Sequence, residues 1–149
     1  MKTLKLYLAH NIENRHEFRK KELELESKYN IKLFNPFYDC SQRKDIKKLD
    51  DLNIVHRTQM DKPFSIKHCK NIVKRDLSSL TKQDGVLAII YKASIGTTLE
   101  IGYAKCKHKK IFIITDNYYN HPWVRVYADY LFISIKDFMI WLDKHGYRK

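Results

Sequence analysis

The amino-acid sequence predicts an α/β protein: a doubly wound, mostly parallel sheet of about five strands with helices on both faces. Short apolar runs without polar alternation recur along the chain, as expected for strands covered on both faces. Stretches with helical periodicity or dense charge separate these runs, as βαβ units require. The chain has 149 residues, 44% of them hydrophobic, which is enough for the core of one domain. We therefore expect a single domain over residues 1–149.

The first part of the chain predicts a strand, a helix and a second strand. Residues 4–9 form a β-prone run, and the charged stretch after them predicts a helix that ends near Tyr29. Residues 31–35 predict the second strand, which Pro36 stops because proline cannot donate to a sheet ladder.

A long polar region follows and runs to about Lys62. Within it, residues 42–52 favour a helix. A connection of this length is typical either of a lid or binding loop or of a disordered segment. The aromatic side chains of Phe37 and Tyr38 favour the functional interpretation.

The second half of the chain predicts three more strands and their helices. Ser65 is placed to cap a helix whose apolar residues predict a buried stripe, namely Ile66, Cys69, Val73, Leu77 and Leu80. Further apolar runs predict strands at residues 86–91, 111–115 and 130–133. An aromatic loop precedes the last strand, at residues 116–123. Ser134 and Asp137 resemble a capping box that opens the last helix, which Gly146 ends.

The stretch from Ser94 to Tyr103 predicts a tight turn and the start of a helix. Gly96 favours the turn, and Thr97 or Thr98 is placed to cap the helix. Glu100 is then expected in the first helical turn, where free N–H groups and the helix dipole favour an ionised carboxylate.

The charge balance is strongly basic, with 29 Lys and Arg against 17 Asp and Glu and a formal charge of +12. Such a surface attracts nucleic acid, an anionic surface or phosphorylated metabolites, and charge alone does not choose among them. The densest basic cluster, residues 105–110, falls where a helix should end. Compensation of the helix dipole and solvation explain that cluster adequately.

The sequence favours a cytoplasmic protein with reduced thiols. No apolar run approaches the roughly 18 residues of a membrane span, and residues 1–8 lack a signal-peptide cleavage pattern. The three cysteines are odd in number and far apart, so they indicate neither a disulfide framework nor a zinc site.

The motifs of several enzyme classes are missing from the sequence. It contains no dinucleotide-binding or P-loop glycine motif, no His-Glu-x-x-His and no Gly-x-Ser-x-Gly. Its seven histidines lack metal-ligand spacing. Two carboxylates, a tight turn and several aromatic loops remain as the chemistry-bearing features.

The predicted topology brings Tyr7, Asp76, Ser94 and Glu100 to the carboxyl edge of the sheet, where they are able to share a pocket. A pair of carboxylates can break a glycosidic bond, with one attacking the anomeric carbon and the other managing protons. An ionised Glu100 suits the nucleophile, and Asp76, with a pKa raised by burial, suits the proton donor. Alternatively, Glu100 is only a partner of the helix dipole and Asp76 only a hydrogen-bonded surface group.

Several segments of the chain carry a family resemblance: Tyr7-Leu8-Ala9 with Arg15, residues 35–39, Asp76, residues 84–88 and residues 94–104. Together they resemble the nucleoside 2-deoxyribosyltransferase family, including the related deoxynucleoside 5′-monophosphate N-glycosidases. The resemblance spans nearly the whole chain. Its most specific part is Gly-Thr-x-x-Glu-Ile-Gly-Tyr-Ala at residues 96–104.

The resemblance implies a flavodoxin-like fold and cleavage of the N-glycosidic bond of 2′-deoxynucleosides, with transfer of the deoxyribosyl group to another nucleobase. By position, Glu100 would be the covalent nucleophile, Tyr7 would hydrogen-bond its carboxylate and Asp76 would exchange a proton with the base. No metal or organic cofactor is implied. The resemblance also implies a homo-oligomer in which the aromatic loop at residues 117–123 serves an adjacent subunit.

Ser94 departs from the pattern of many transferases, which carry an acidic residue six positions before the glutamate. The related monophosphate glycosidases resemble this chain in having a serine there, in contact with phosphate. The residues expected to bind substrate are Ser94, Gly96, Thr97, Ala9, His10, Arg15, Phe37 and Tyr38. Among these, His10 and Arg15 would be placed to support a phosphate.

Three functions therefore stay open. Deoxyribosyl transfer comes first, because the turn after the first strand is not the glycine-rich loop of the monophosphate glycosidases. Hydrolysis of deoxynucleoside 5′-monophosphates comes second, favoured by Ser94 and the net charge. A non-catalytic nucleotide- or nucleic-acid-binding domain is third, favoured by the net charge and the aromatic loops.

Overall fold

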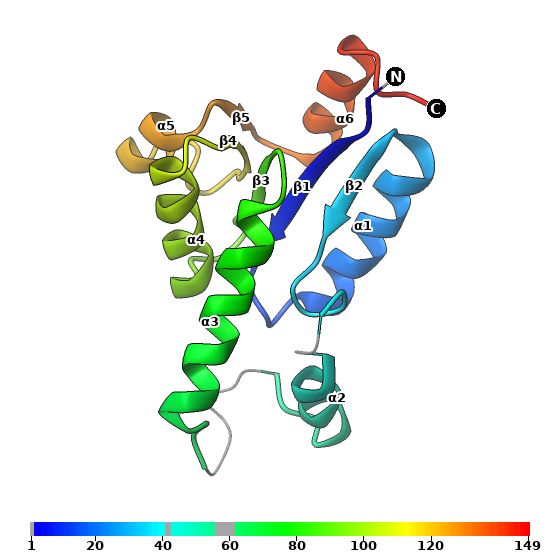
Figure 1. The fold of residues 1–149 in the computed structure, drawn as a ribbon. Coiled ribbons are helices and arrows are strands. Elements are labelled where there is room, and N and C mark those ends of the chain that lie inside the picture. Colours follow the sequence, from blue (N-terminus) through cyan, green and yellow to red (C-terminus); the bar gives the residue numbers. More distant parts are fainter. Residues whose placement is uncertain (1, 41–42, 56–61) are drawn as a thin grey trace.

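The computed structural model describes residues 2–40, 43–55 and 62–149. Its centre is a sheet of five strands in the order β2-β1-β3-β4-β5, with every neighbouring pair parallel (Figure 1). The strands are β1 (Leu4–Ala9), β2 (Ile31–Phe34), β3 (Gly85–Ile89), β4 (Lys110–Ile114) and β5 (Tyr130–Phe132). The helices are α1 (Arg15–Lys28), α2 (Arg43–Asp51), α3 (Ile66–Thr81), α4 (Ile95–Cys106), α5 (Pro122–Tyr127) and α6 (Ile135–Lys144). The predicted doubly wound α/β fold with a parallel sheet is confirmed.

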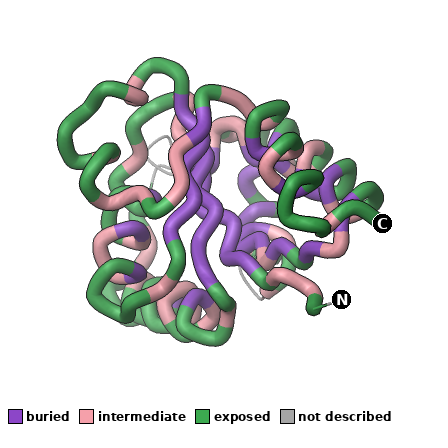
Figure 2. The backbone as a smooth tube through the Cα atoms, turned by 90° about the horizontal axis from the view of Figure 1, so that it is seen from above, coloured by how far each residue is buried: buried purple, intermediate pink, exposed green. Residues whose placement is uncertain are grey.

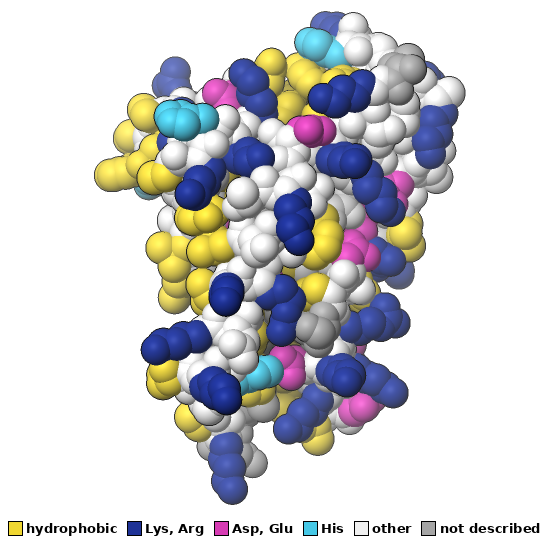
Figure 3. All heavy atoms as spheres, in the orientation of Figure 1, with side chains coloured by type: hydrophobic (Ala, Val, Ile, Leu, Met, Phe, Trp, Pro, Cys, Tyr) yellow, Lys and Arg dark blue, Asp and Glu magenta, His cyan; other side chains and the backbone are white. Residues whose placement is uncertain are grey.

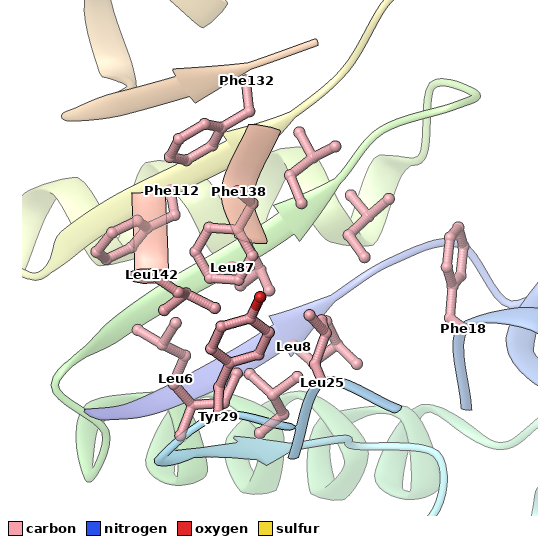
Figure 4. Close-up of a cluster of buried hydrophobic side chains, with 14 residues drawn as sticks. Leu6, Leu8, Phe18, Leu25, Tyr29, Leu87, Phe112, Phe132, Phe138 and Leu142 are labelled. Carbon is pink, nitrogen blue, oxygen red and sulfur yellow. The ribbon is translucent and has the colours of Figure 1, made fainter. Parts of the chain in front are cut away.

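Different helices cover the two faces of the sheet, because side chains alternate along each strand. Leu6 and Leu8 of β1 pack in a cluster with residues of α1 and α6, which Figure 4 shows in close-up. Tyr7 and Ala9 pack on the opposite face, in a cluster with residues of α3, α4 and α5. The strands between these layers are buried along most of their length (Figure 2). This alternation decides that Tyr7 faces α3 and α4.

The long polar region after β2 contains α2, as predicted. Ile46 and Leu49 of α2 form a small third core with Ile12 and Phe37. Residues 41–42 and 56–61 of this region lie outside the described residues.

The buried stripe predicted for α3 is wrong in part. Ile66 and Val73 are 72% and 55% exposed, whereas Ile72 and Leu80 are buried. Ile66 is exposed because the start of α3 extends past the ends of the strands (Figure 1). Val73 is exposed because the side of α3 that faces the protein passes through Ile72 and Leu80.

The short helix α5 was not predicted, because its N-cap residue, His121, lies within the stretch interpreted as an aromatic loop. The ring of His121 accepts a hydrogen bond from the backbone N–H of Trp123, and Pro122 occupies the first turn, where its missing N–H costs nothing. Ser65 and Ser134 cap α3 and α6 as predicted.

On the face that Figure 3 shows, Lys and Arg side chains are spread out rather than gathered at one place. Within the predicted basic cluster, Lys105 lies 5.9 Å from the ring centre of Tyr127, and Lys109 donates to the carbonyl of Gln83 at 2.8 Å. These lysines thus help to hold the end of α4 in place. In the described part of the chain, no helix combines the length and the apolar character needed to cross a membrane.

Replacement of Gly85 by alanine should destabilise the protein, because a Cβ atom there would overlap the backbone carbonyl of Lys110 on the neighbouring strand. Overpacking of this kind costs about 1–3 kcal/mol. Gly102→Ala is the matched control: nothing lies within 4 Å of a Cβ at that helical position, and alanine should add about 1 kcal/mol of stability. Urea unfolding of the two variants measures both effects, and equal stabilities would contradict the packing argument.

Candidate active site

The candidate site lies at the carboxyl edge of the sheet, where β1 and β3 end side by side. Ala9 pairs with Ala88 in the register of these two strands. The loops that follow them are joined by an ion pair between Glu13 and Lys92, with the two charged atoms 2.8 Å apart. Parallel α/β sheets bind their ligands at this edge.

The helix that carries the site, α4, begins earlier than predicted. Its first residue is Ile95, and Ser94 occupies the N-cap position without a capping hydrogen bond from its side chain. Gly96 lies inside the helix and does not have a positive φ. The predicted glycine turn at Gly96 and the predicted cap by Thr97 or Thr98 are therefore wrong. The chain bends at Tyr91 and Lys92 instead, and Ser94 leads into the helix with an extended backbone.

Glu100 consequently lies in the second turn of α4 and not in the first. Burial raises the pKa of its carboxyl to about 8; the nearby hydroxyl of Tyr7 lowers it, and the charge of Asp76 raises it further. The expected ionised form is therefore not the main form of the free protein at neutral pH. Loss of solvent outweighs the helix dipole at this position.

Tyr7 is fully buried on the α3–α4 face of the sheet. Burial raises the pKa of its hydroxyl above the ordinary value, and the charges of Glu100 and Asp76 act in the same direction. Among the described residues, neither this hydroxyl nor Oε2 of Glu100 has a hydrogen-bond partner of standard geometry, although the two groups are close enough to shift each other's pKa. A neutral hydroxyl beside a carboxylate is able to donate to it.

Asp76 comes from α3 and is half-buried. Its charge raises the pKa of both Glu100 and Tyr7, so it lies within electrostatic reach of both groups. The structure thus brings together the three residues expected to be catalytic.

The start of α4 leaves space in front of Glu100. A Cβ atom at Gly96 would meet only Oε1 of Glu100, at 4.0 Å. Thr97 is 3% exposed, and its hydroxyl has no partner among the described residues. Ala9 is buried on the same face of the sheet as Tyr7.

Arg15 is placed differently from the substrate contact that was expected. Its guanidinium donates twice to Oδ1 of Asp50, at 2.6 and 3.1 Å. It also donates to the carbonyls of Ile12, Ile54 and Val55, at 2.9–3.0 Å. All five of its N–H groups are thus occupied, so Arg15 holds α2 against α1 and has no donor left for a phosphate.

His10, Phe37 and Tyr38 also contact α1 and α2. Burial lowers the pKa of His10 to about 4, so its ring is neutral and brings no charge to a substrate. Phe37 belongs to the small core with α2. The hydroxyl of Tyr38 hydrogen-bonds the ring of His16 at 2.9 Å, and the guanidinium of Arg19 lies 5.0 Å from the centre of the Tyr38 ring.

Two polar residues near this edge were missed in the sequence, Asn11 and Glu22. Asn11 is 6% exposed and follows β1 directly. Glu22 is 1% exposed and accepts a hydrogen bond from Asn35 at 2.7 Å, and burial raises its pKa to about 7. Its spacing from Phe18 and Leu25 on α1 is helical, so a place on the buried stripe was readable from the sequence.

A cavity of about 390 Å³ lies on the other side of α4, between that helix and α5. It is lined by Ile90, Ala93, Thr98, Ile101, Ile113, Tyr118, His121, Trp123, Val124 and Tyr127. Tyr118, His121 and Trp123 of the aromatic loop therefore face this cavity, and Glu100 is not among the residues that line it. No group of three or more His, Cys, Asp or Glu side chains in the described ranges is arranged to hold a metal ion.

A solved structure of a 2-deoxyribosyltransferase, from the psychrotolerant bacterium Bacillus psychrosaccharolyticus, is similar to this chain with a TM-score of 0.58. The two proteins share a fold. The similarity covers 90% of this chain and 89% of that one at 19% sequence identity, so it establishes the architecture and confirms the flavodoxin-like prediction. No protein-family model and no curated protein sequence matches the chain.

Replacement of Glu100 by glutamine should stabilise the protein at alkaline pH. Because the folded-state pKa of about 8 lies above the ordinary 4.5, the wild-type protein loses stability as the pH rises between these values. We expect Glu100→Gln to unfold with a free energy higher by on the order of 2 kcal/mol at pH 9, and with no gain from this source at pH 4.

Glu24→Gln is the control for this measurement, because Glu24 is exposed and its hydrogen bond with Lys28 lowers its pKa. Chemical unfolding of both variants across the pH range provides the test. A gain for Glu100→Gln that does not change with pH would contradict the assignment of a buried, titrating carboxyl.

Proposed function

We propose that this protein cleaves the N-glycosidic bond of 2′-deoxynucleosides and transfers the deoxyribosyl group to another nucleobase. The observation that carries the proposal is the meeting of Glu100, Tyr7 and Asp76 at the carboxyl edge of the sheet. The shared fold with a 2-deoxyribosyltransferase supports it. Small deoxynucleosides and nucleobases are then the partners of the site.

In the first step, ionised Glu100 attacks C1′ of the deoxyribose, and the bond from C1′ to the base nitrogen breaks. The electron pair of that bond goes to the base, which takes a proton from Asp76. Because the pKa of Glu100 is raised, Glu100 and Asp76 together retain a proton at neutral pH. Transfer of this proton from Glu100 to Asp76 before the reaction makes Glu100 a nucleophile and Asp76 an acid. The positive charge that develops on the sugar then stabilises the poorly solvated carboxylate.

In the second step, a nitrogen of the incoming base attacks C1′, and Glu100 leaves as a carboxylate. The incoming base returns its proton to Asp76, so the cycle closes without a cofactor. Throughout, the neutral hydroxyl of Tyr7 donates to Glu100 and fixes its orientation.

Hydrolysis of deoxynucleoside 5′-monophosphates is the second candidate. Ser94 supports it, because its side chain makes no capping bond and it lies at the N-terminus of α4, where free backbone N–H groups attract anions. Water would then replace the incoming base in the second step.

We further propose a homo-oligomer formed through the exposed apolar side chains of α4 and α5. Ile95 and Leu99 of α4 are 84% and 67% exposed, and Trp123 and Val126 of α5 are 66% and 71% exposed. Large apolar patches of this kind are usually covered by a partner. A second copy of the chain would also bring its aromatic loop to the neighbour.

The cytoplasm is the proposed location. Cys40, Cys69 and Cys106 are free thiols. Free thiols are typical of a reducing compartment, and deoxynucleosides and nucleobases are available there.

Glu100→Gln should lower base release from deoxynucleosides by roughly 10³-fold or more, because the covalent step loses its nucleophile. Glu24→Gln, on an exposed helix position, should keep full activity. Chromatography of each deoxynucleoside and its monophosphate, with and without a second base, separates the candidates. Exchange of bases supports transfer, and free sugar or sugar phosphate supports hydrolysis. Ligand binding without base release would support the non-catalytic domain.

Leu99→Lys should lower the molecular mass that light scattering measures. A lysine within the apolar patch would lose its solvent when the interface forms, and burial of an unpaired charge is costly. Leu23→Lys on α1 is the matched control, because Leu23 is 50% exposed on a different helix. An unchanged mass for Leu99→Lys would place the interface elsewhere.

A further inference from the structure

Four buried side-chain atoms of the described residues have no hydrogen-bond partner: Tyr7 Oη, Asn11 Oδ1, Thr97 Oγ1 and Glu100 Oε2. All four come from β1, the loop after it and the first two turns of α4. Buried polar atoms in proteins are nearly always paired, because an unpaired one costs about 1–3 kcal/mol. The proposed chemistry uses Tyr7 and Glu100 but leaves Asn11 and Thr97 without a role.

Asn11 is held firmly by its neighbours. Its backbone carbonyl accepts a hydrogen bond from Nδ1 of His10 at 3.0 Å, and its Nδ2 donates to Oδ1 of Asn14 at 2.8 Å. The ring of His10 is itself fixed, with its centre 5.0 Å from that of Phe37 and 4.8 Å from that of Phe18. The atom of Asn11 that remains free is therefore its carbonyl oxygen, which can only accept.

Asn11 also lies at the candidate site. Tyr7 and Ala9 pack on the α3–α4 face of the sheet, and Asn11 is the next residue but one after Ala9. The ion pair between Glu13 and Lys92 ties the loop of Asn11 to the loop that leads into α4. Ser94 and Thr97 begin that helix.

We propose that Oδ1 of Asn11 accepts a hydrogen bond from the 5′-hydroxyl of the deoxyribose, with the Thr97 hydroxyl as a second partner, and so selects nucleosides over 5′-monophosphates. The inference rests on the proposed function. A hydroxyl donates to one oxygen and accepts from another, so it suits a site that offers the acceptor oxygen of Asn11 and the Thr97 hydroxyl, which can do both. A phosphate dianion has no proton to donate and would turn its oxygens toward the lone pairs of Asn11.

The decisive experiment compares Asn11→Leu with the wild type on a 2′-deoxynucleoside and on its analogue without the 5′-hydroxyl. With the deoxynucleoside, kcat/KM should fall about 10–100-fold, the usual worth of a lost hydrogen bond that leaves a polar group unpaired. With the analogue, wild type and Asn11→Leu should be within about threefold of each other. Equal losses on both substrates would overturn the proposal.

Two further variants keep the test valid if Asn11→Leu folds poorly. Asn11→Asp keeps an acceptor toward the 5′-hydroxyl, and the amide of Asn14 can turn so that it donates to the other carboxylate oxygen. The variant should retain deoxynucleoside use within about threefold and use 5′-monophosphates less well than the wild type does. Asn14→Asp can only accept, so it keeps Nδ2 of Asn11 turned toward residue 14 and should leave kcat/KM unchanged. A large loss in Asn14→Asp, or improved monophosphate use in Asn11→Asp, would overturn the proposal.

A wild type without base release from any deoxynucleoside would refute the proposed function and, with it, this role of Asn11. A wild type that releases base, with Asn11→Leu equally impaired on both substrates, would refute the role of Asn11 alone. The two failures are thus distinguishable in one set of assays.

Discussion

The site depends on the burial of the Glu100 carboxyl away from water. A carboxylate that is covered by protein holds its proton to higher pH, and the pKa of about 8 shows that burial dominates here. The fold produces this burial by starting α4 at Ile95, which moves Glu100 one turn deeper than a helix starting at Thr98 would. The hydroxyl of Tyr7 and the charge of Asp76 then act on its pKa in opposite directions. The ionised form of a carboxyl in this position gains stability when positive charge develops beside it.

The position of helix α2 depends on a different interaction. Helix α2 packs through a small core and is fastened by Arg15, whose guanidinium reaches Asp50 and two carbonyls that follow α2. Burial opposes ionisation of Asp50, but the hydrogen bonds and charge of Arg15 outweigh it and hold the pKa of that carboxyl below its usual range. Replacing either Arg15 or Asp50 alone would leave the other charge without this partner. The stability lost in that way usually exceeds the stability that the ion pair itself contributes. The hydrogen bonds of Arg15 therefore help to hold α2 near the carboxyl edge of the sheet.

The sheet and most helices could be predicted from the sequence, because non-alternating apolar runs and serine caps are local signals. The start of α4 could not, since Gly96 and the two threonines offer several plausible starts and only packing chooses among them. The same holds for Arg15, which the sequence presents as a free cation near the substrate. Its five hydrogen bonds go to four acceptor atoms, three of which lie 35–40 residues further along the chain. The meeting of Tyr7, Asp76 and Glu100 was expected because a parallel sheet brings the carboxyl ends of its strands to one edge. The unpaired oxygen of Asn11 could be recognised only from the positions of His10 and Asn14.

The net charge of +12 says little about the substrate. The basic cluster at residues 105–110 lies at the far end of α4 from Ser94, a distance of roughly 18 Å for a helix of 12 residues. Arg15 has no free donor, and the low pKa of His10 keeps its ring neutral, so neither brings charge to the carboxyl edge. A phosphate at this edge would rely on Ser94 and backbone N–H groups, and it would meet the acceptor oxygen of Asn11. If Asn11 has the proposed role, an uncharged sugar hydroxyl would satisfy that oxygen, and the site would favour a nucleoside although the chain carries a net charge of +12.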